Sequence, residues 1–103
     1  MSDFPKPPRT HDEFVSTFPE LAEAWQAVGA AGKEGPLDRK TCRLIKLALA
    51  MGAGQEGAVH ASVRKGLAMG ITREELFQVV RLAAGTVGFP QTVAVFTWID
   101  DLL

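Results

Sequence analysis

Helix start signals recur along the chain, and no segment alternates apolar and polar residues in the way that a strand does. Capping residues or early prolines precede apolar runs of helical spacing at Thr10, Thr17, Pro19, Asp38, Thr72 and Pro90. Between Asp38 and Thr72 we expect two helices, because Gly52 and Gly54 interrupt the pattern and Gly70 suits a helix end. The sequence therefore predicts an all-α fold, a compact bundle of about six helices.

A chain of 103 residues is long enough for one domain with one core. Residues 1–9 contain three prolines and two basic residues, which predicts a flexible arm, and residues 10–103 are predicted to form the single all-helical domain. The expected third and sixth helices are more apolar than a small bundle can hide. We therefore expect the domain to bury part of this surface against another copy of itself.

The charge balance and the cysteine count limit the classes of function. Eleven basic and twelve acidic residues give no electrostatic reason to expect nucleic acid or an anionic membrane as a partner. The single cysteine, Cys42, cannot form an internal disulfide and fits a reducing compartment. Residues 1–10 lack the apolar run of a signal peptide, which predicts a cytoplasmic protein. The uncharged run 82–99 contains Gly85, Gly88 and Pro90, which predicts two helices rather than one membrane span.

Residues 55–70, QEGAVHASVRKGLAMG, contain Glu56 and His60 four positions apart. On a helix these side chains share one face and lie one turn apart. A carboxylate beside an imidazole can fix its tautomer and raise its basicity, which suits proton transfer. The same spacing also occurs in ordinary surface pairs, which stabilise a helix by only about 0.3–0.5 kcal/mol. Both interpretations stay open.

Three further residues are candidates for a site, and Cys42 is not one of them. Arg43 and Lys46 could bind a carboxylate, as a bidentate clamp and a point charge, or could form a solvated basic edge. Ser62 could donate a hydrogen bond in a pocket or simply pack among alanines. Cys42 lies in an apolar run, where a buried thiol is normally inert. One Glu and one His supply two ligands, so no metal site is predicted, and no other cofactor is expected.

From Leu37 to Phe89 the chain resembles the carboxymuconolactone decarboxylase family, which includes the alkyl hydroperoxidase D-like (AhpD-like) proteins. Three phrases carry the resemblance, LDRKTCRLIKLALAMG, VRKGLAMGITREELFQVVRLAA and VGFPQTVAVF, and the GITREEL junction is the most specific part. The resemblance implies a compact all-α bundle that assembles as trimers or hexamers.

The active-site residues of the family are not found at the matching positions. Peroxidase-type members have Cys-x-x-Cys at the start of the fourth helix, a His four residues later and a Glu on the preceding helix. Aligning VRKGLAMGIT places these positions at Gln55, Ala58, Ser62 and Arg43. Decarboxylase-type members keep the His with a Glu four residues before it, which falls on Ser62 and Ala58. The chain thus resembles a cysteine-free member in which EGAVH replaces the usual site.

An alternative alignment, shifted by two residues, would place His60 and Glu56 on the decarboxylase pair. It requires a change of length inside a helix, which would rotate the face by about 200°. The unshifted alignment is therefore preferred.

Two functions stay open. The first is a decarboxylase-like or lyase-like enzyme for a small carboxylate-type substrate, with His60 as acid or base, Glu56 as its orienting group, and Arg43 or Lys46 binding the anion. The second is a non-catalytic oligomeric binding or assembly protein of the same family. In both, the expected partner is the chain itself, as a homotrimer or homohexamer, and a small-molecule ligand is expected for the enzyme. Thiol peroxidase chemistry is excluded, because it needs a reactive thiolate and a resolving thiol.

Overall fold

The computed structural model describes residues 9–103, so the predicted arm lies outside the described residues except for Arg9. This part of the chain forms six α-helices and no strand, which confirms the predicted fold class. In chain order the helices are α1 (Arg9–Thr17), α2 (Pro19–Gly32), α3 (Arg39–Ala53), α4 (Glu56–Ala68), α5 (Arg73–Val87) and α6 (Phe89–Asp100).

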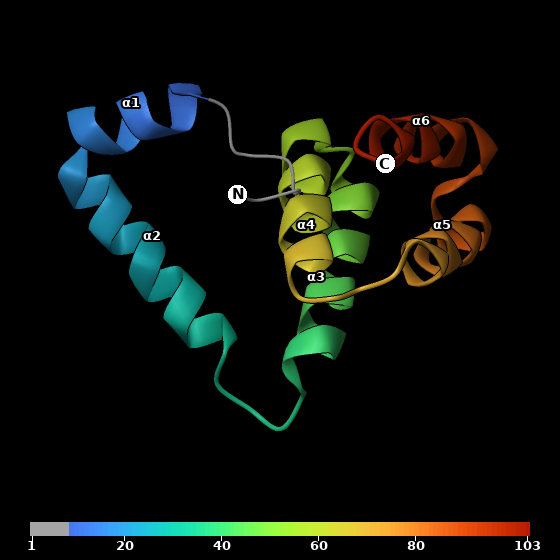
Figure 1. Cartoon of the computed structure of the whole chain (residues 1–103), viewed down its shortest axis with the longest axis horizontal. Coiled ribbons are helices and arrows are strands. Elements are labelled where there is room, and N and C mark those ends of the chain that lie inside the picture. Colours follow the sequence, from blue (N-terminus) through green and yellow to red (C-terminus); the bar gives the residue numbers. More distant parts are fainter. Residues whose placement is uncertain (1–8) are drawn as a thin grey trace.

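Helices α3 to α6 form the core (Figure 1). The main contacts join α3 to α4 and α5 to α6, and further contacts join α3 to α5 and α4 to α6, so the four helices close into a bundle. Each helix contributes apolar side chains to the centre because its apolar residues recur at helical spacing. The buried core consists of Leu47, Met51, Val59, Val63, Ile71, Leu76, Val79, Val95 and Ile99.

Helices α1 and α2 diverge from this bundle (Figure 1, blue to teal). They contact each other, and the rings of Phe14 and Phe18 lie 5.2 Å apart between centroids. Neither helix contains a buried residue. The apolar side chains Leu21, Trp25 and Val28 of α2 therefore remain exposed.

Several helix ends are those that the sequence predicts. Asp38 caps α3 by accepting a hydrogen bond from the backbone N–H of Thr41 at 2.7 Å. Thr72 and Glu75 form the expected capping box of α5, with both reciprocal hydrogen bonds present. Gly70 follows α4 with a φ of 87°, and the N–H of Ile71 returns to the carbonyl of Gly66 at 2.9 Å. This is the Schellman ending, which favours glycine at the left-handed position.

Three helix starts differ from the prediction. Helix α1 begins at Arg9 and already contains Thr10, its predicted N-cap. The N-cap of α2 is Phe18 rather than Thr17, because the Thr17 hydroxyl donates to the carbonyl of Glu13 at 2.7 Å instead. Helix α6 begins at Phe89, one residue before Pro90.

The uncharged run 82–99 is divided between α5 and α6 at Gly88, as expected. Within residues 9–103, every helix is too short or too polar to serve as a membrane span.

The left-handed position at Gly70 gives a direct test of this architecture. We expect Gly70→Ala to lower the free energy of unfolding by about 1–2 kcal/mol, because a Cβ disfavours positive φ. Gly85→Ala is the matched control, since Gly85 lies inside α5 with open space around it. That variant should be stabilised by up to about 1 kcal/mol. Urea denaturation of both proteins measures the two effects. If both substitutions changed the free energy of unfolding in the same direction, the assignment of the α4 ending would be contradicted.

Candidate functional site

Helix α4 holds His60 at the edge of the bundle. The helix turns Val59, Ser62, Val63 and Gly66 into the interior, and His60, next to Val59, is half-buried. Its Nε2 atom is buried and has no hydrogen-bond partner among the described residues. A buried polar atom without a partner is uncommon and costs free energy unless a ligand, a water or another chain satisfies it. His60 is therefore the side chain of α4 best placed to receive such a partner.

Glu56 is the first residue of α4 and is exposed. A carboxylate at this position interacts favourably with the positive end of the helix dipole. No ion pair joins Glu56 to His60 in the described part of the chain. The helical spacing thus places both residues on one side of α4, while the orienting contact between them stays a prediction.

Arg43 lies against α4 from the neighbouring helix α3. Its Cγ atom would be 3.7 Å from a Cβ added at Gly66, so the aliphatic part of the side chain packs on the bare backbone there. Within residues 9–103 the buried Nε atom has no hydrogen-bond partner, and burial lowers the pKa of Arg43. A desolvated guanidinium of this kind gains most from an anionic partner.

Arg43 belongs to a group of basic residues. Burial lowers the pKa of Lys65, and repulsion from Arg43, Lys46, Arg64 and Lys33 lowers it further. None of these five residues forms an ion pair with a carboxylate among residues 9–103. We call this set the basic cluster. Like charges without counter-charges attract anions, so the cluster is a candidate anion-binding surface.

The sequence predicted Arg43 and Lys46 for this role but missed Lys65. The sequence contained the information to find Lys65, because it follows Ser62 by three residues and so lies near Ser62 on α4. Ser62 itself is buried, with 6% of its surface exposed, and faces the interior. Its predicted role in a ligand pocket stays a prediction.

The side chain of Arg43 contacts α4 at a different place from His60. Arg43 packs at Gly66, six residues after His60. On an α-helix this spacing corresponds to about 120° of rotation and about 9 Å along the axis. The contact of Arg43 and the side chain of His60 therefore lie on different faces of α4, whereas Arg64 of the basic cluster shares the face of His60.

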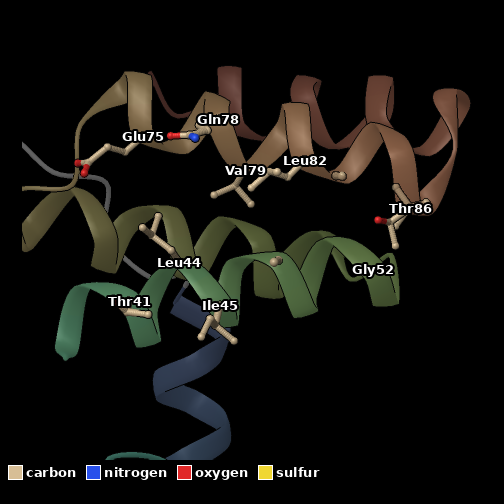
Figure 2. Close-up of a pocket in the computed structure, with 12 residues that line it drawn as sticks. Thr41, Leu44, Ile45, Gly52, Glu75, Gln78, Val79, Leu82 and Thr86 are labelled. Atoms are coloured by element: carbon tan, nitrogen blue, oxygen red, sulfur yellow. The ribbon is translucent and has the colours of Figure 1, made fainter. Parts of the chain in front are cut away.

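A mainly apolar hollow lies elsewhere, between α3 and α5 (Figure 2). We call it the α3/α5 groove; its volume is about 510 Å³, and its main apolar lining is Leu44, Ile45, Ala48, Val79, Leu82 and Ala83. Thr41 and Glu75 lie at one end, and Gly52 and Thr86 at the other. None of the five predicted site residues lines it, and sequence reasoning did not foresee it.

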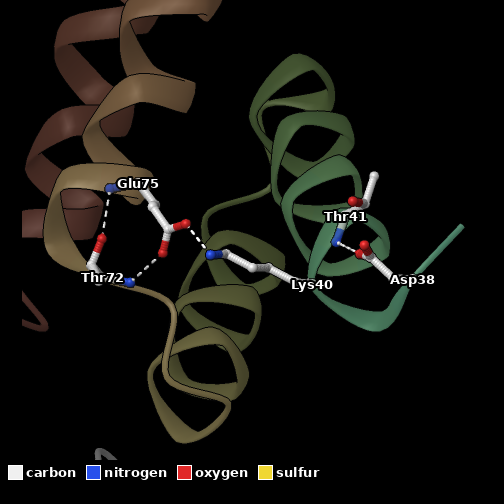
Figure 3. Close-up of polar contacts among 5 residues, drawn as sticks. All are labelled: Asp38, Lys40, Thr41, Thr72 and Glu75. Carbon is white, nitrogen blue, oxygen red and sulfur yellow. Dashed lines mark hydrogen bonds and ion pairs between the residues drawn. The ribbon is translucent and has the colours of Figure 1, made fainter.

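A polar connection joins α3 and α5 at the end of the α3/α5 groove (Figure 3). Lys40 of α3 forms an ion pair with Glu75 of α5, whose carboxylate also accepts the N–H of Thr72 at 2.9 Å. The bond to Lys40, followed by the backbone bond of Thr72, lowers the pKa of Glu75. The capping box was predicted, but the partner on another helix was not.

No group of three or more potential ligands among His, Cys, Asp and Glu is close enough to hold a metal ion within residues 9–103. The thiol of Cys42 is half-buried, 3.7 Å from the carbonyl oxygen of Leu37.

Comparison with known proteins identifies the family. A model of the carboxymuconolactone decarboxylase family matches residues 19–101, and the chain belongs to this family. The match extends beyond the Leu37–Phe89 region that suggested it, and includes α2. No curated protein has a sequence that matches the chain significantly.

A solved structure supports the same assignment. It is the apo form of a carboxymuconolactone decarboxylase family protein from Legionella pneumophila, with a TM-score of 0.77 and 28% sequence identity. The similarity covers 88% of this chain and 82% of the Legionella chain. The fold of the family therefore accounts for nearly the whole of this protein.

The Lys40–Glu75 connection predicts how stability depends on pH. The pKa of Glu75 is lower in the folded protein than in the unfolded chain, so its contribution is complete above the ordinary carboxyl pKa and is lost as pH falls through the folded value. We expect Glu75→Gln to be less stable than the wild type at pH 7 and nearly equal to it at acid pH. Urea denaturation from pH 7 to pH 3 measures this difference.

Glu74→Gln is the control, because it removes a neighbouring carboxylate that is not part of the capping box. A difference between wild type and Glu75→Gln that stays constant with pH would contradict a role for the ionised carboxylate.

Proposed function

We propose that the protein is an acid–base enzyme of the carboxymuconolactone decarboxylase family, in which His60 transfers the proton. The observation that carries this proposal is the buried Nε2 atom of His60, which lacks a partner among the described residues. An imidazole can donate from one ring nitrogen and accept at the other, so an unoccupied nitrogen is suited to a substrate. Family membership supports the reaction class.

The chemistry needs one proton donor. In a decarboxylation the bond between the carboxylate carbon and its neighbour breaks, and CO₂ leaves. The electron pair that remains on the neighbouring carbon must take a proton, which protonated His60 would supply and later recover from solvent. Glu56 can support this step, because Cβ atoms four residues apart on a helix are about 5–6 Å apart and a rotamer change would let the carboxylate reach the ring.

The basic cluster would bind the carboxylate of such a substrate. Arg43 offers a partly buried guanidinium, and Lys46 and Lys65 offer ammonium groups beside it. Arg43 packs on a different face of α4 from His60, but Arg64 of the cluster lies one turn from His60 on the same face, within reach of the carboxylate of a substrate held there. We expect a second copy to complete the site around Arg43, in keeping with the expected homotrimer or homohexamer.

Substitution of His60 tests the proposal. With carboxymuconolactone as the probe, we expect His60→Ala to lower kcat about 10²- to 10⁴-fold, the usual contribution of a positioned proton donor. Release of CO₂ measures the rate. His11→Ala is the control, because His11 lies exposed on α1. If His60→Ala keeps the wild-type rate, His60 is not the proton donor.

The basic cluster predicts a different kinetic effect. We expect Arg43→Gln and Lys46→Gln to raise KM for carboxymuconolactone about tenfold, because each removes a charged partner of the substrate, with a smaller change in kcat. Arg81→Gln is the matched control, since Arg81 is exposed on α5 and is not part of the cluster. An equal effect of all three substitutions would show only a general loss of positive charge.

A second candidate function is supported by the hollows of the molecule. Neither of the two hollows defined within residues 9–103 is lined by Glu56 or His60, and the α3/α5 groove is mainly apolar. This arrangement favours a non-catalytic binding or assembly protein of the same family. Absence of turnover by the wild-type oligomer, together with no change of the His60 NMR signals on adding carboxymuconolactone, would support this alternative against the enzyme.

A further inference from the structure

Positive charge is concentrated on one part of this chain. Six of the eleven basic residues lie on α3 and α4, whereas Glu56 is the only one of the twelve acidic residues on these two helices. The nearly neutral sum over the whole chain therefore conceals a strongly uneven distribution of charge. A surface of this kind attracts anions at one place, even though the molecule as a whole does not.

Three of these cations converge where α3 packs on α4 (Figure 1). The aliphatic part of Arg43 lies against Gly66, and the residue before Gly66 on α4 is Lys65. Lys46 follows Arg43 by three residues, so it lies one turn further along the same side of α3. Glu56 comes nine residues before Lys65, which corresponds to about 14 Å along α4. The single acidic residue of the two helices is thus too far away to neutralise these charges.

The three side chains are accessible to a ligand. Lys46 and Lys65 are exposed, and Arg43 is half-buried. None of them forms an ion pair with a carboxylate in the part of the chain that the structure describes. Packing on Gly66 restricts the aliphatic part of Arg43, so binding an anion there costs less side-chain entropy than binding to a free arginine would.

The charge of the basic cluster fits a phosphate group better than a single carboxylate. Lys65 alone is repelled by four other cations, and one carboxylate supplies only one compensating negative charge. A phosphate ester carries a charge of about −1.5 to −2 at pH 7 and has three strong acceptor oxygens. An arginine can donate to two of these oxygens at once, while lysine ammonium groups bind as point charges from other sides.

The distribution of charge favours a small ligand over a polyanionic macromolecule. Nucleic acid is held through several phosphates that are spread along the protein surface. Here the cations gather at one end of the α3–α4 contact, and eleven of the twelve acidic residues lie outside these two helices. Those carboxylates repel a long polyanion, but they have little effect on a ligand that is confined to the basic cluster.

We propose that the basic cluster binds the phosphate group of a small phosphorylated molecule, with Arg43, Lys46 and Lys65 as the contacting residues. This inference rests on the proposed function in placing the substrate at the basic cluster, and it adds that the substrate carries a phosphate. Arg64 and Lys33 raise the positive potential from the edge of the cluster.

Binding of inorganic phosphate tests the proposal, with malonate, a small dicarboxylate of similar charge, as the comparison ligand. We expect phosphate to bind about tenfold more tightly than malonate at equal ionic strength, measured by isothermal titration calorimetry. Arg43→Gln and Lys65→Gln should each weaken phosphate binding about tenfold, because each removes a charged donor. Lys65 is exposed, so its substitution should leave the bundle folded. Arg81→Gln on α5 is the control and should keep the wild-type affinity.

The pKa of the bound phosphate gives an independent readout. Nearby cations favour the dianion, so the second pKa of phosphate, ordinarily about 6, should be lower in the complex than in solution. ³¹P NMR across this pH range follows the titration, and the lowering should be smaller in Lys65→Gln. An unchanged pKa at saturating protein would contradict direct contact between phosphate and the cluster.

Three further outcomes would overturn the proposal: equal affinity for malonate and phosphate, wild-type phosphate affinity in both cluster variants, or binding of single-stranded DNA or anionic lipid vesicles without binding of phosphate. Failure of the proposed function gives a different result. Phosphate binding that depends on Arg43 and Lys65, in a protein whose turnover does not depend on His60, would support this inference and remove the proposed enzyme. Turnover that depends on His60, in a protein that does not bind phosphate, would do the reverse.

Discussion

The apolar contact between α3 and α4 is the interaction on which the rest of the structure depends. Leu47 and Met51 from α3 and Val59 and Val63 from α4 are fully or almost fully buried. Each such side chain stabilises the fold by about 1.5–3 kcal/mol through loss of contact with water. The same contact fixes the rotation of α4, so it decides which of its side chains stay at the edge of the bundle. The half-buried position of His60 is a consequence of this packing.

The sequence predicted most helices because their ends are determined by residues within a few positions of each other. Asp38 and Gly70 act on backbone groups of the same turn, so the residue type alone is nearly sufficient to predict the helix end. The predicted start of α2 was wrong by one residue. A threonine hydroxyl can cap the following helix or donate to the carbonyl four residues before it, and Thr17 donates to Glu13. The partner of Glu75 was not predictable, since Lys40 comes from a distant part of the chain.

The candidate site was only partly predictable for a similar reason. Helical spacing was enough to place Glu56 and His60 on one side of α4, but contact between two flexible side chains depends on rotamers that spacing does not determine. The separation of Arg43 from His60 arises from how α3 crosses α4, which no local pattern encodes. The apolar spacing of α2 predicted an amphipathic helix, but it contained no information on which surface would cover that helix.

The absence of buried residues in α1 and α2 has a consequence for synthesis of the chain. A ribosome makes residues 9–34 before any part of the bundle exists. The α3/α5 groove requires both helices, and α5 is complete only at Val87. During this interval Trp25 and its neighbours are exposed to other nascent chains and to chaperones that bind apolar segments. The apolar face of α2 thus stays exposed for the whole time in which the bundle is made.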